Sequence, residues 1–317
     1  MKRITQNSTV EIIIPVLNEQ DSLEKLVQKI HQAFHKTKFK YRVRFIDDGS
    51  TDNSWNIIKK LAKKNRNISA IRLRKTQGKT SALYWGFQHS KSSIVAMMDA
   101  DLQDDPAEIP KMIRQLQKGY GLVNGWKKDR KDPLIKRLSS FAFNTYISLL
   151  FQVRLKDINC GIKVMRGEVA LKLEMWGDMH RFIPILAHNM GYDISEIPVR
   201  HFPRTFGQSK YGFMRFVSGF VQSILVLIMT RFRQSPMRLL GGLGLFILIL
   251  SMIALSYLFV IWLLPLGPIG TRPLFIVSIV GLVIATQLIL FGAVAELLVS
   301  NADRIENESK FIDQVLK

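Results

Sequence analysis

Carboxylates and amides gather in four short polar segments, each of which follows an apolar, β-branched run. The segments are residues 15–19, 47–52, 77–80 and 99–105. Asp99, Asp101 and Gln103 form the most specific of these patterns. Carboxylate and amide oxygens are ligands for Mg²⁺ or Mn²⁺, ions that commonly also bind substrate phosphates. The pattern therefore indicates a metal that neutralises a leaving diphosphate, although a solvated acidic turn has the same residue types.

A glycine-lysine-threonine sequence at residues 78–80 suggests a phosphate-binding loop, but the spacing excludes the P-loop motif. That motif requires a glycine five residues before Gly78, and Leu73 occupies the position. Lys79 can still offer an ammonium group to phosphate oxygens. The six histidines form no metal-binding motif, so we expect no zinc site and treat them as structural or surface residues.

The elements that must position these residues alternate between strands and helices. Runs at 10–16, 41–46, 68–73 and 94–98 predict strands, and amphipathic patterns at 20–33, 53–63 and 79–89 predict helices. Such alternation is typical of an α/β domain with a mostly parallel sheet. Ligands of these sheets bind at the carboxyl ends of the strands, which is where the polar segments fall.

Two long apolar runs near the C-terminus predict membrane spans. Residues 239–264 carry no charge, and residues 273–300 carry only Glu296 near their end. Each is long enough to cross a hydrocarbon core of about 30 Å as a helix. Three arginines precede the first run and one lies between the two, so the positive-inside rule places the large domain and the tail in the cytoplasm.

The net charge of +20 lies almost entirely before the first span. It suits nucleic acid, anionic lipid head groups or a phosphate-bearing substrate, and the spans favour the last two. Residues 136–151 and 211–232 are apolar and flanked by basic residues, which predicts helices in the head-group plane, with ordinary core helices as the alternative. Cys160 is the sole cysteine, so no intramolecular disulfide can form.

The motifs IPVLNE, FIDDGSTD, QGKTSAL and MDADLQDDP, in this order, resemble those of family 2 glycosyltransferases. With DINCGIKVM, RTFGQSKYG and the paired spans, the chain looks like a polyprenyl-phosphate glycosyltransferase of the GtrB type, related to dolichol-phosphate mannose synthase. The resemblance implies a GT-A fold, Rossmann-like, with interfacial helices and two transmembrane helices. It also implies inverting transfer of a sugar to a polyprenyl phosphate at a bacterial inner membrane.

The resemblance also assigns roles to individual residues. Nucleotide-sugar binding is implied for Pro15, Leu17, Glu19, Asp48, Lys79 and Asp99, and metal binding for Asp99, Asp101 and Gln103. Asp157 is expected beside the attacking oxygen, either as a base or as an orienting group. The cations and hydroxyl expected to bind the lipid phosphate are Lys127, Arg137, Ser139, Arg204 and Lys210.

The expected organisation has four parts: a catalytic domain over 1–210, a juxtamembrane amphipathic helix over 211–235, two spans over 236–302 and a cytoplasmic tail over 303–317. The glycines at 241, 242 and 244 could pack against another helix, which predicts a homo-oligomer.

UDP-glucose and undecaprenyl phosphate are the expected substrates, with GDP-mannose or another UDP-sugar as alternatives. A processive polysaccharide synthase is disfavoured because no tryptophan follows an arginine. A non-catalytic scaffold would not require the set Asp99, Asp101, Gln103 and Asp157. A nucleic-acid binder is suggested only by charge, without a motif.

Overall fold

The computed structural model describes residues 8–35, 37–128, 134–203, 214–232, 235–264 and 267–311, with the backbone alone at 134–141, 214–218, 231 and 301–311. The chain divides into two compact units, Met1–Val226 and Leu227–Lys317. The boundary between the units falls inside a helix, and the finer four-part division stays a prediction.

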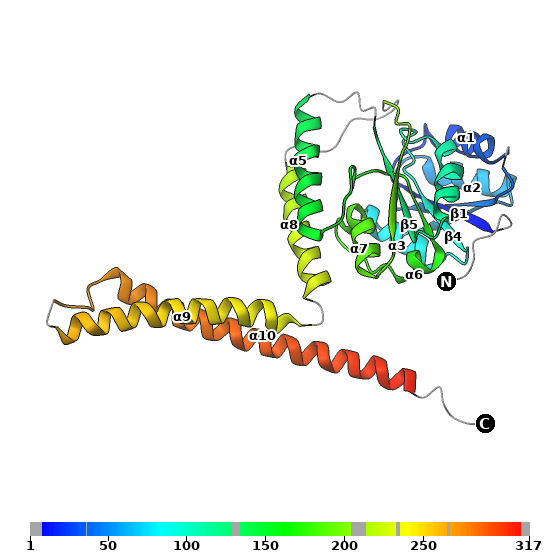
Figure 1. Cartoon of the computed structure of the whole chain (residues 1–317). Coiled ribbons are helices and arrows are strands. Elements are labelled where there is room, and N and C mark those ends of the chain that lie inside the picture. Colours follow the sequence, from blue (N-terminus) through cyan, green and yellow to red (C-terminus); the bar gives the residue numbers. More distant parts are fainter. Residues whose placement is uncertain are drawn as a thin grey trace. The chain divides into compact units, whose positions relative to one another are not determined.

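The first unit is built on one seven-stranded sheet (Figure 1). Its strands are β1 (Thr9–Val16), β2 (Lys40–Asp47), β3 (Ile68–Arg72), β4 (Ile94–Met97), β5 (Leu122–Trp126), β6 (Lys163–Arg166) and β7 (Ile194–Pro198). They lie in the order β3-β2-β1-β4-β6-β5-β7, in which β6 alone runs antiparallel to its neighbours. The prediction of a mostly parallel sheet is confirmed.

Helices cover both faces of this sheet because its central strands are apolar on both sides. Ile12 and Ile14 of β1 pack into a core shared with α1, α2 and α4, whereas Ile13 faces Gly86 of α3. A Cβ at Gly86 would lie 2.4 Å from the Ile13 side chain, so the glycine permits the close approach of helix and sheet. The bounds are α1 (Leu23–His35), α2 (Ser54–Lys64), α3 (Lys79–Gln88), η1 (Pro106–Glu108), α4 (Ile109–Leu116), α6 (Gly167–Lys172), η2 (Met179–Phe182) and α7 (Ile183–Asn189).

Two apolar helices, α5 (Leu134–Phe151) and α8 (Met214–Arg231), run side by side over the part of α8 that belongs to the first unit (Figure 1). The Tyr146 ring lies 5.5 Å from the Phe220 ring, and the Tyr146 hydroxyl lies 3.2 Å from the hydroxyl of Ser223. Large apolar side chains on both helices remain exposed, among them Leu149 at 76% and Val221 at 59%. The helices predicted at 136–151 and 211–232 are therefore present, with apolar surface left uncovered.

The second unit is a pair of long helices, α9 (Pro236–Leu263) and α10 (Pro273–Phe311). Within them, Pro236–Leu263 and Pro273–Ser300 are long and apolar enough to cross a membrane. Gly244 packs against Ala285 and Ile289 of α10, and Gly292 packs against Met237. Gly244 thus serves the α9 and α10 pair itself, whereas a Cβ at Gly242 would meet nothing within 4 Å, and the homo-oligomer stays a prediction.

The single acid of the two apolar segments, Glu296, is satisfied by the beginning of α9. Its carboxylate accepts hydrogen bonds from the Met237 backbone N–H at 3.1 Å and from the Ser235 hydroxyl at 3.3 Å. A carboxylate at a helix N-terminus satisfies a backbone N–H that has no partner within the helix. Glu296 therefore ties the start of α9 to α10.

Candidate functional site

Loops at the carboxyl ends of β1 and β2 are joined by hydrogen bonds. The backbone N–H of Asn18 donates to the Ser50 hydroxyl at 3.0 Å, and the Asn18 side-chain oxygen accepts from the Thr51 N–H at 2.9 Å. The Glu19 N–H donates to the Ser54 hydroxyl at 2.9 Å. These contacts place Pro15, Glu19 and the exposed Leu17 beside the loop of Asp48, as the sequence predicted for a single binding edge.

Asp48 connects this pair of loops to the loop after β3. Its two carboxylate oxygens accept the backbone N–H groups of Gln77 and Gly78, each at 2.8 Å. Gly49 has φ of 76° and lies against Thr76, where a Cβ would come within 2.9 Å of a backbone nitrogen. Both oxygens of Asp48 are thus engaged in shaping the loop that carries Lys79.

We call the loops at the carboxyl ends of β1 to β4 the rim. Lys79 joins the third and fourth of these loops, since its ammonium group contacts the Asp99 carboxylate after β4. Burial alone would raise the pKa of Asp99, but the charge and hydrogen bond of Lys79 lower it to about 2. Lys127, beyond β5, lies near enough to lower that pKa further. The structure therefore brings together a predicted donor-site lysine, a predicted metal ligand and a predicted lipid-phosphate cation.

The loop after Asp99 is held in a strained conformation. Leu102 is buried with φ of 63°, a region that bulky residues rarely adopt, and the Asp101 carboxylate accepts the N–H of Gln103 at 3.2 Å. The Gln103 carbonyl accepts the Phe202 N–H at 2.7 Å, and Asp104 bonds His201 at 3.2 Å. Such strain persists only where surrounding contacts enforce it. Here the contacts are the hydrogen bond within the loop and those to Phe202 and His201.

A divalent ion fits the oxygen groups of this loop. A Cβ at Gly161 would lie 2.5 Å from an oxygen of Asp104 and 3.1 Å from an oxygen of Asp99, so the glycine lets both carboxylates converge. Among the described residues, no three His, Cys, Asp or Glu side chains form a complete metal cluster. Mg²⁺ commonly binds one or two carboxylates together with substrate phosphates, so metal binding by Asp99, Asp101 and Gln103 stays a prediction.

Asp157 lies four residues before Gly161, in the segment that leads into β6. It is buried, and one carboxylate oxygen accepts the Lys127 backbone N–H at 3.3 Å. The carboxylate therefore fixes the backbone of a predicted phosphate-binding lysine. The sequence left two roles open for Asp157, a base and an orienting group. This contact favours the orienting group.

Two basic residues of the site were not assigned from the sequence. Lys163 is fully buried in β6, where burial lowers its pKa and its ammonium group donates to the Cys160 carbonyl. His180, expected to be structural or superficial, has its Nδ1 2.8 Å from the Thr80 hydroxyl, and burial holds its pKa well below the usual range. The motif HRF following a turn gave no sign that His180 would reach the loop of Lys79.

Four predicted lipid-phosphate residues cannot be placed by their side chains. Arg137 and Ser139 belong to α5, of which only the backbone is described at that point, and Arg204 and Lys210 lie outside the described residues. Their assignment remains a prediction.

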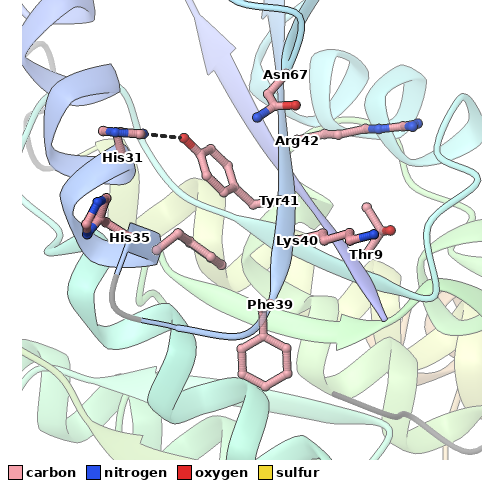
Figure 2. Close-up of a pocket in the computed structure, with 9 residues that line it drawn as sticks. Thr9, His31, His35, Phe39, Lys40, Tyr41, Arg42 and Asn67 are labelled. Carbon is pink, nitrogen blue, oxygen red and sulfur yellow. Dashed lines mark hydrogen bonds between the residues drawn. The ribbon is translucent and has the colours of Figure 1, made fainter. Parts of the chain in front are cut away.

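A separate hollow of about 340 Å³ lies at the opposite edge of the sheet, where β1 and β2 begin (Figure 2). Tyr41 points into it, with its hydroxyl 3.1 Å from His31 Nδ1, and Lys40 and Arg42 line one side. None of the residues predicted to bind substrate lines this hollow. It is therefore distinct from the rim described above.

Residues 11–170 match the model of the family described as Glycosyl transferase family 2. The chain is 30% identical over 312 residues to dodecaprenyl-phosphate galacturonate synthase of Rhizobium johnstonii, covering 97% of this chain and 92% of the relative. It is 32% identical over 260 residues to undecaprenyl-phosphate 4-deoxy-4-formamido-L-arabinose transferase of Edwardsiella ictaluri, covering 82% and 78% respectively.

Solved structures of glucosyl-3-phosphoglycerate synthase from Mycobacterium tuberculosis share the fold. The complex with Mg²⁺ and uridine diphosphate has a TM-score of 0.55 at 16% identity, covering 70% of this chain and 79% of that one. The complex with Mn²⁺, uridine diphosphate and glucosyl-3-phosphoglycerate has a TM-score of 0.55 at 17% identity, covering 70% and 80%. At these identities the likeness concerns the fold, and it confirms the GT-A architecture.

Proposed function

Because this chain belongs to the family 2 glycosyltransferases and is a polyprenyl-phosphate glycosyltransferase, we propose that it transfers glucose from UDP-glucose to undecaprenyl phosphate with inversion. The observation that carries the proposal is the joined rim at the carboxyl ends of β1 to β4. There Lys79 meets Asp99, and Lys127 lies beside them.

The nucleoside end of the donor is assigned to the first two loops. Pro15, Leu17 and Glu19 border the rim, and Asp48 shapes it through Gln77 and Gly78. A nucleobase that hydrogen-bonds to Asp48 must share the carboxylate with the Gln77 and Gly78 backbone N–H groups or replace them. The diphosphate is assigned to Lys79, whose ammonium group is already compensated by a carboxylate.

A metal ion is assigned to Asp99, Asp101 and Gln103. When bound, Mg²⁺ or Mn²⁺ supplies positive charge to the leaving diphosphate. The convergence of Asp99 and Asp104 on Gly161 supports a divalent ion at this loop. The strained backbone at Leu102 holds Asp101 and Gln103 in place for this role.

The acceptor step needs little proton transfer. An oxygen of the polyprenyl phosphate, already ionised at neutral pH, attacks the anomeric carbon as the bond from that carbon to the diphosphate oxygen breaks. The nucleoside diphosphate leaves with the bonding electrons. Lys127 binds the incoming phosphate, and Asp157 orients it through the Lys127 backbone. Arg137, Ser139, Arg204 and Lys210 are proposed to bind the same phosphate.

The catalytic unit is assigned to the cytoplasmic side of the inner membrane, with α9 and α10 as its two spans. Arg231, Arg233 and Arg238 precede the apolar part of α9, whereas Arg272 alone lies between the two helices. The side with more basic residues is the cytoplasmic one by the positive-inside rule, which supports this orientation. The exposed apolar surface of α5 and α8 supports their position in the head-group plane, where the lipid phosphate lies.

We expect the purified protein to label undecaprenyl phosphate from UDP-[¹⁴C]glucose with Mn²⁺ or Mg²⁺, and not with EDTA. The names of the relatives make galacturonate and 4-deoxy-4-formamido-L-arabinose the first alternatives, so their UDP derivatives and GDP-mannose are assayed in parallel. Labelling from one of these alone would replace glucose while keeping the reaction. No labelled lipid from any donor would refute the proposed transfer.

Gly161→Ala is expected to lower turnover by about a hundredfold, because misplacing reacting groups by about 1 Å can cost that much. The new Cβ would displace Asp104, which is buried and held by His201, and would crowd Asp99. Steady-state transfer assays measure the loss. Gly242→Ala, at a helical site where a Cβ meets nothing within 4 Å, is the matched control. Equal activity of the two variants would show that the convergence at Gly161 is unimportant.

A further inference from the structure

Three polar residues lie in register across three neighbouring strands. Asn124 of β5 is opposite Glu196 of β7 on one side and opposite Lys163 of β6 on the other. Residues directly opposite each other in a sheet project to the same face. Asn124 is fully buried and Lys163 is 1% exposed. We call Glu196, Asn124 and Lys163 the polar row.

Each member of the polar row binds the backbone of the loop that carries Asp157. Glu196 accepts the Lys156 N–H at 2.7 Å and the Asp157 N–H at 3.2 Å. Asn124 donates to the Asp157 carbonyl at 2.9 Å, and Lys163 donates to the Cys160 carbonyl. The loop is therefore held at both ends by groups from three strands.

Glu196 is the centre of this arrangement. One of its oxygens also accepts the Asn124 side-chain amide at 2.9 Å, so the carboxylate receives three donors. A carboxylate has acceptor sites for all of them, whereas a carboxamide has one oxygen and brings two hydrogens of its own. Asn124 and Asp157 are buried, and a buried donor that loses its acceptor is costly, so the loop depends on the two oxygens of Glu196.

The main-chain groups of Asp157 are thereby fixed on both sides. Its N–H is bound by Glu196, its carbonyl by Asn124, and its carboxylate by the Lys127 N–H. Rotation of the residue requires breaking at least one of these bonds. The direction of the Asp157 carboxylate, and with it the backbone of Lys127, is consequently set from β5 and β7.

We propose that Glu196 is a positioning residue for sugar transfer, acting through Asp157 on the acceptor phosphate. The proposal rests on the proposed function, since it takes the acceptor role of Asp157 from there. It assigns to β7 a part in turnover, although β7 lies at the edge of the sheet remote from the donor rim. Glu196 itself makes no contact with the donor in this role.

Glu196→Gln keeps the shape of the side chain but places an amide N–H₂ against the backbone donors. We expect kcat to fall about tenfold or more, as for misaligned reacting groups, with the donor KM unchanged. The matched control is Glu11→Gln, a buried strand glutamate that binds Arg44 at 2.7 Å and Ser90 at 2.6 Å away from the rim. It should lower Tm and leave kcat unchanged. A fall in kcat that merely follows Tm in both variants would overturn the positioning role.

A double-mutant cycle with Asp157→Asn tests whether Glu196 acts through Asp157. In the Asp157→Asn background, Glu196→Gln should cost little further activity, because coupled residues are non-additive. Full additivity would overturn the proposal. Hydrogen exchange provides a readout that needs no substrate: Glu196→Gln should remove protection from the Lys156 and Asp157 amides, whereas Glu11→Gln should not. Unchanged protection would overturn the positioning, while absent transfer by the wild-type protein would instead refute the proposed function.

Discussion

The Asp101→Ala variant is expected to lose about a thousandfold in transfer rate, a loss of about 4 kcal/mol in transition-state stabilisation. Asp101 is 8% exposed and lies one residue before the strained Leu102, so its carboxylate is held in a fixed direction. Removing it takes away an oxygen ligand of the proposed ion and leaves the leaving diphosphate with less compensating charge. The Asp101 hydrogen bond to the Gln103 N–H is lost as well.

Initial rates over a range of Mn²⁺ concentrations measure this effect. The variant should need far more Mn²⁺ and should not reach the wild-type rate at saturation. Asp105→Asn is the matched control from the same loop, because asparagine can still cap the short helix η1 through the Ala107 N–H, and Asp105 has no assigned part in binding. Normal metal dependence in Asp101→Ala would place the ion elsewhere.

Asp157→Asn is expected to lower kcat by about a hundredfold, with the KM for the nucleotide sugar little changed. The substitution keeps the size of the side chain and removes a negative charge next to Lys127. An asparagine can also turn its N–H₂ group toward the Lys127 N–H, which would release the backbone that Asp157 now fixes. The proposed donor-binding loops are those after β1 to β4, so donor binding should persist.

Separate titrations of donor and acceptor at steady state distinguish these effects. Asp193→Asn, at an exposed position before β7, is the control for loss of a carboxylate. A variant that loses donor affinity but keeps kcat would assign Asp157 to the nucleotide sugar. A pH profile that loses its acidic limb only in Asp157→Asn would indicate a base instead of an orienting group.

The strands β1 to β4 were predictable because each contains apolar and β-branched residues. Apart from Glu11, residues 10–16 and 94–98 are apolar on both faces, as is typical of strands covered by two helical layers, and the structure places β1 and β4 there. The polar segments after these strands then follow from the rule for parallel sheets. The start of the first helix was predicted at residue 20, but Ser22 bonds back to Glu19 in a turn and α1 begins at Leu23.

The strands β5 to β7 and the contacts that they make could not be predicted from the sequence, for physical reasons. β6 has four residues and contains a fully buried lysine, so it lacks an apolar signature. Glu196 lies 39 positions from Asp157, and their contact depends on the register of β5 with β7, which one sequence does not reveal. His180 is 100 positions from Thr80. Contacts of this kind require the folded sheet, whereas Asp157 itself was assigned from the resemblance to a family, and its role stays a prediction.

The polar row also bears on how the enzyme is made. A chain leaves the ribosome N-terminus first, and the loops of the donor rim all precede β5 in the sequence. The hydrogen bond from the Asp157 N–H to Glu196 cannot form until Glu196 has been synthesised. The helix α9 follows soon after, at Pro236. The acceptor half is therefore completed only shortly before the membrane helices emerge. The loops after β1, β2 and β3, which are joined through Ser50 and Asp48, are thus synthesised well before Glu196, whereas the loop of Asp99 also awaits Phe202 and His201.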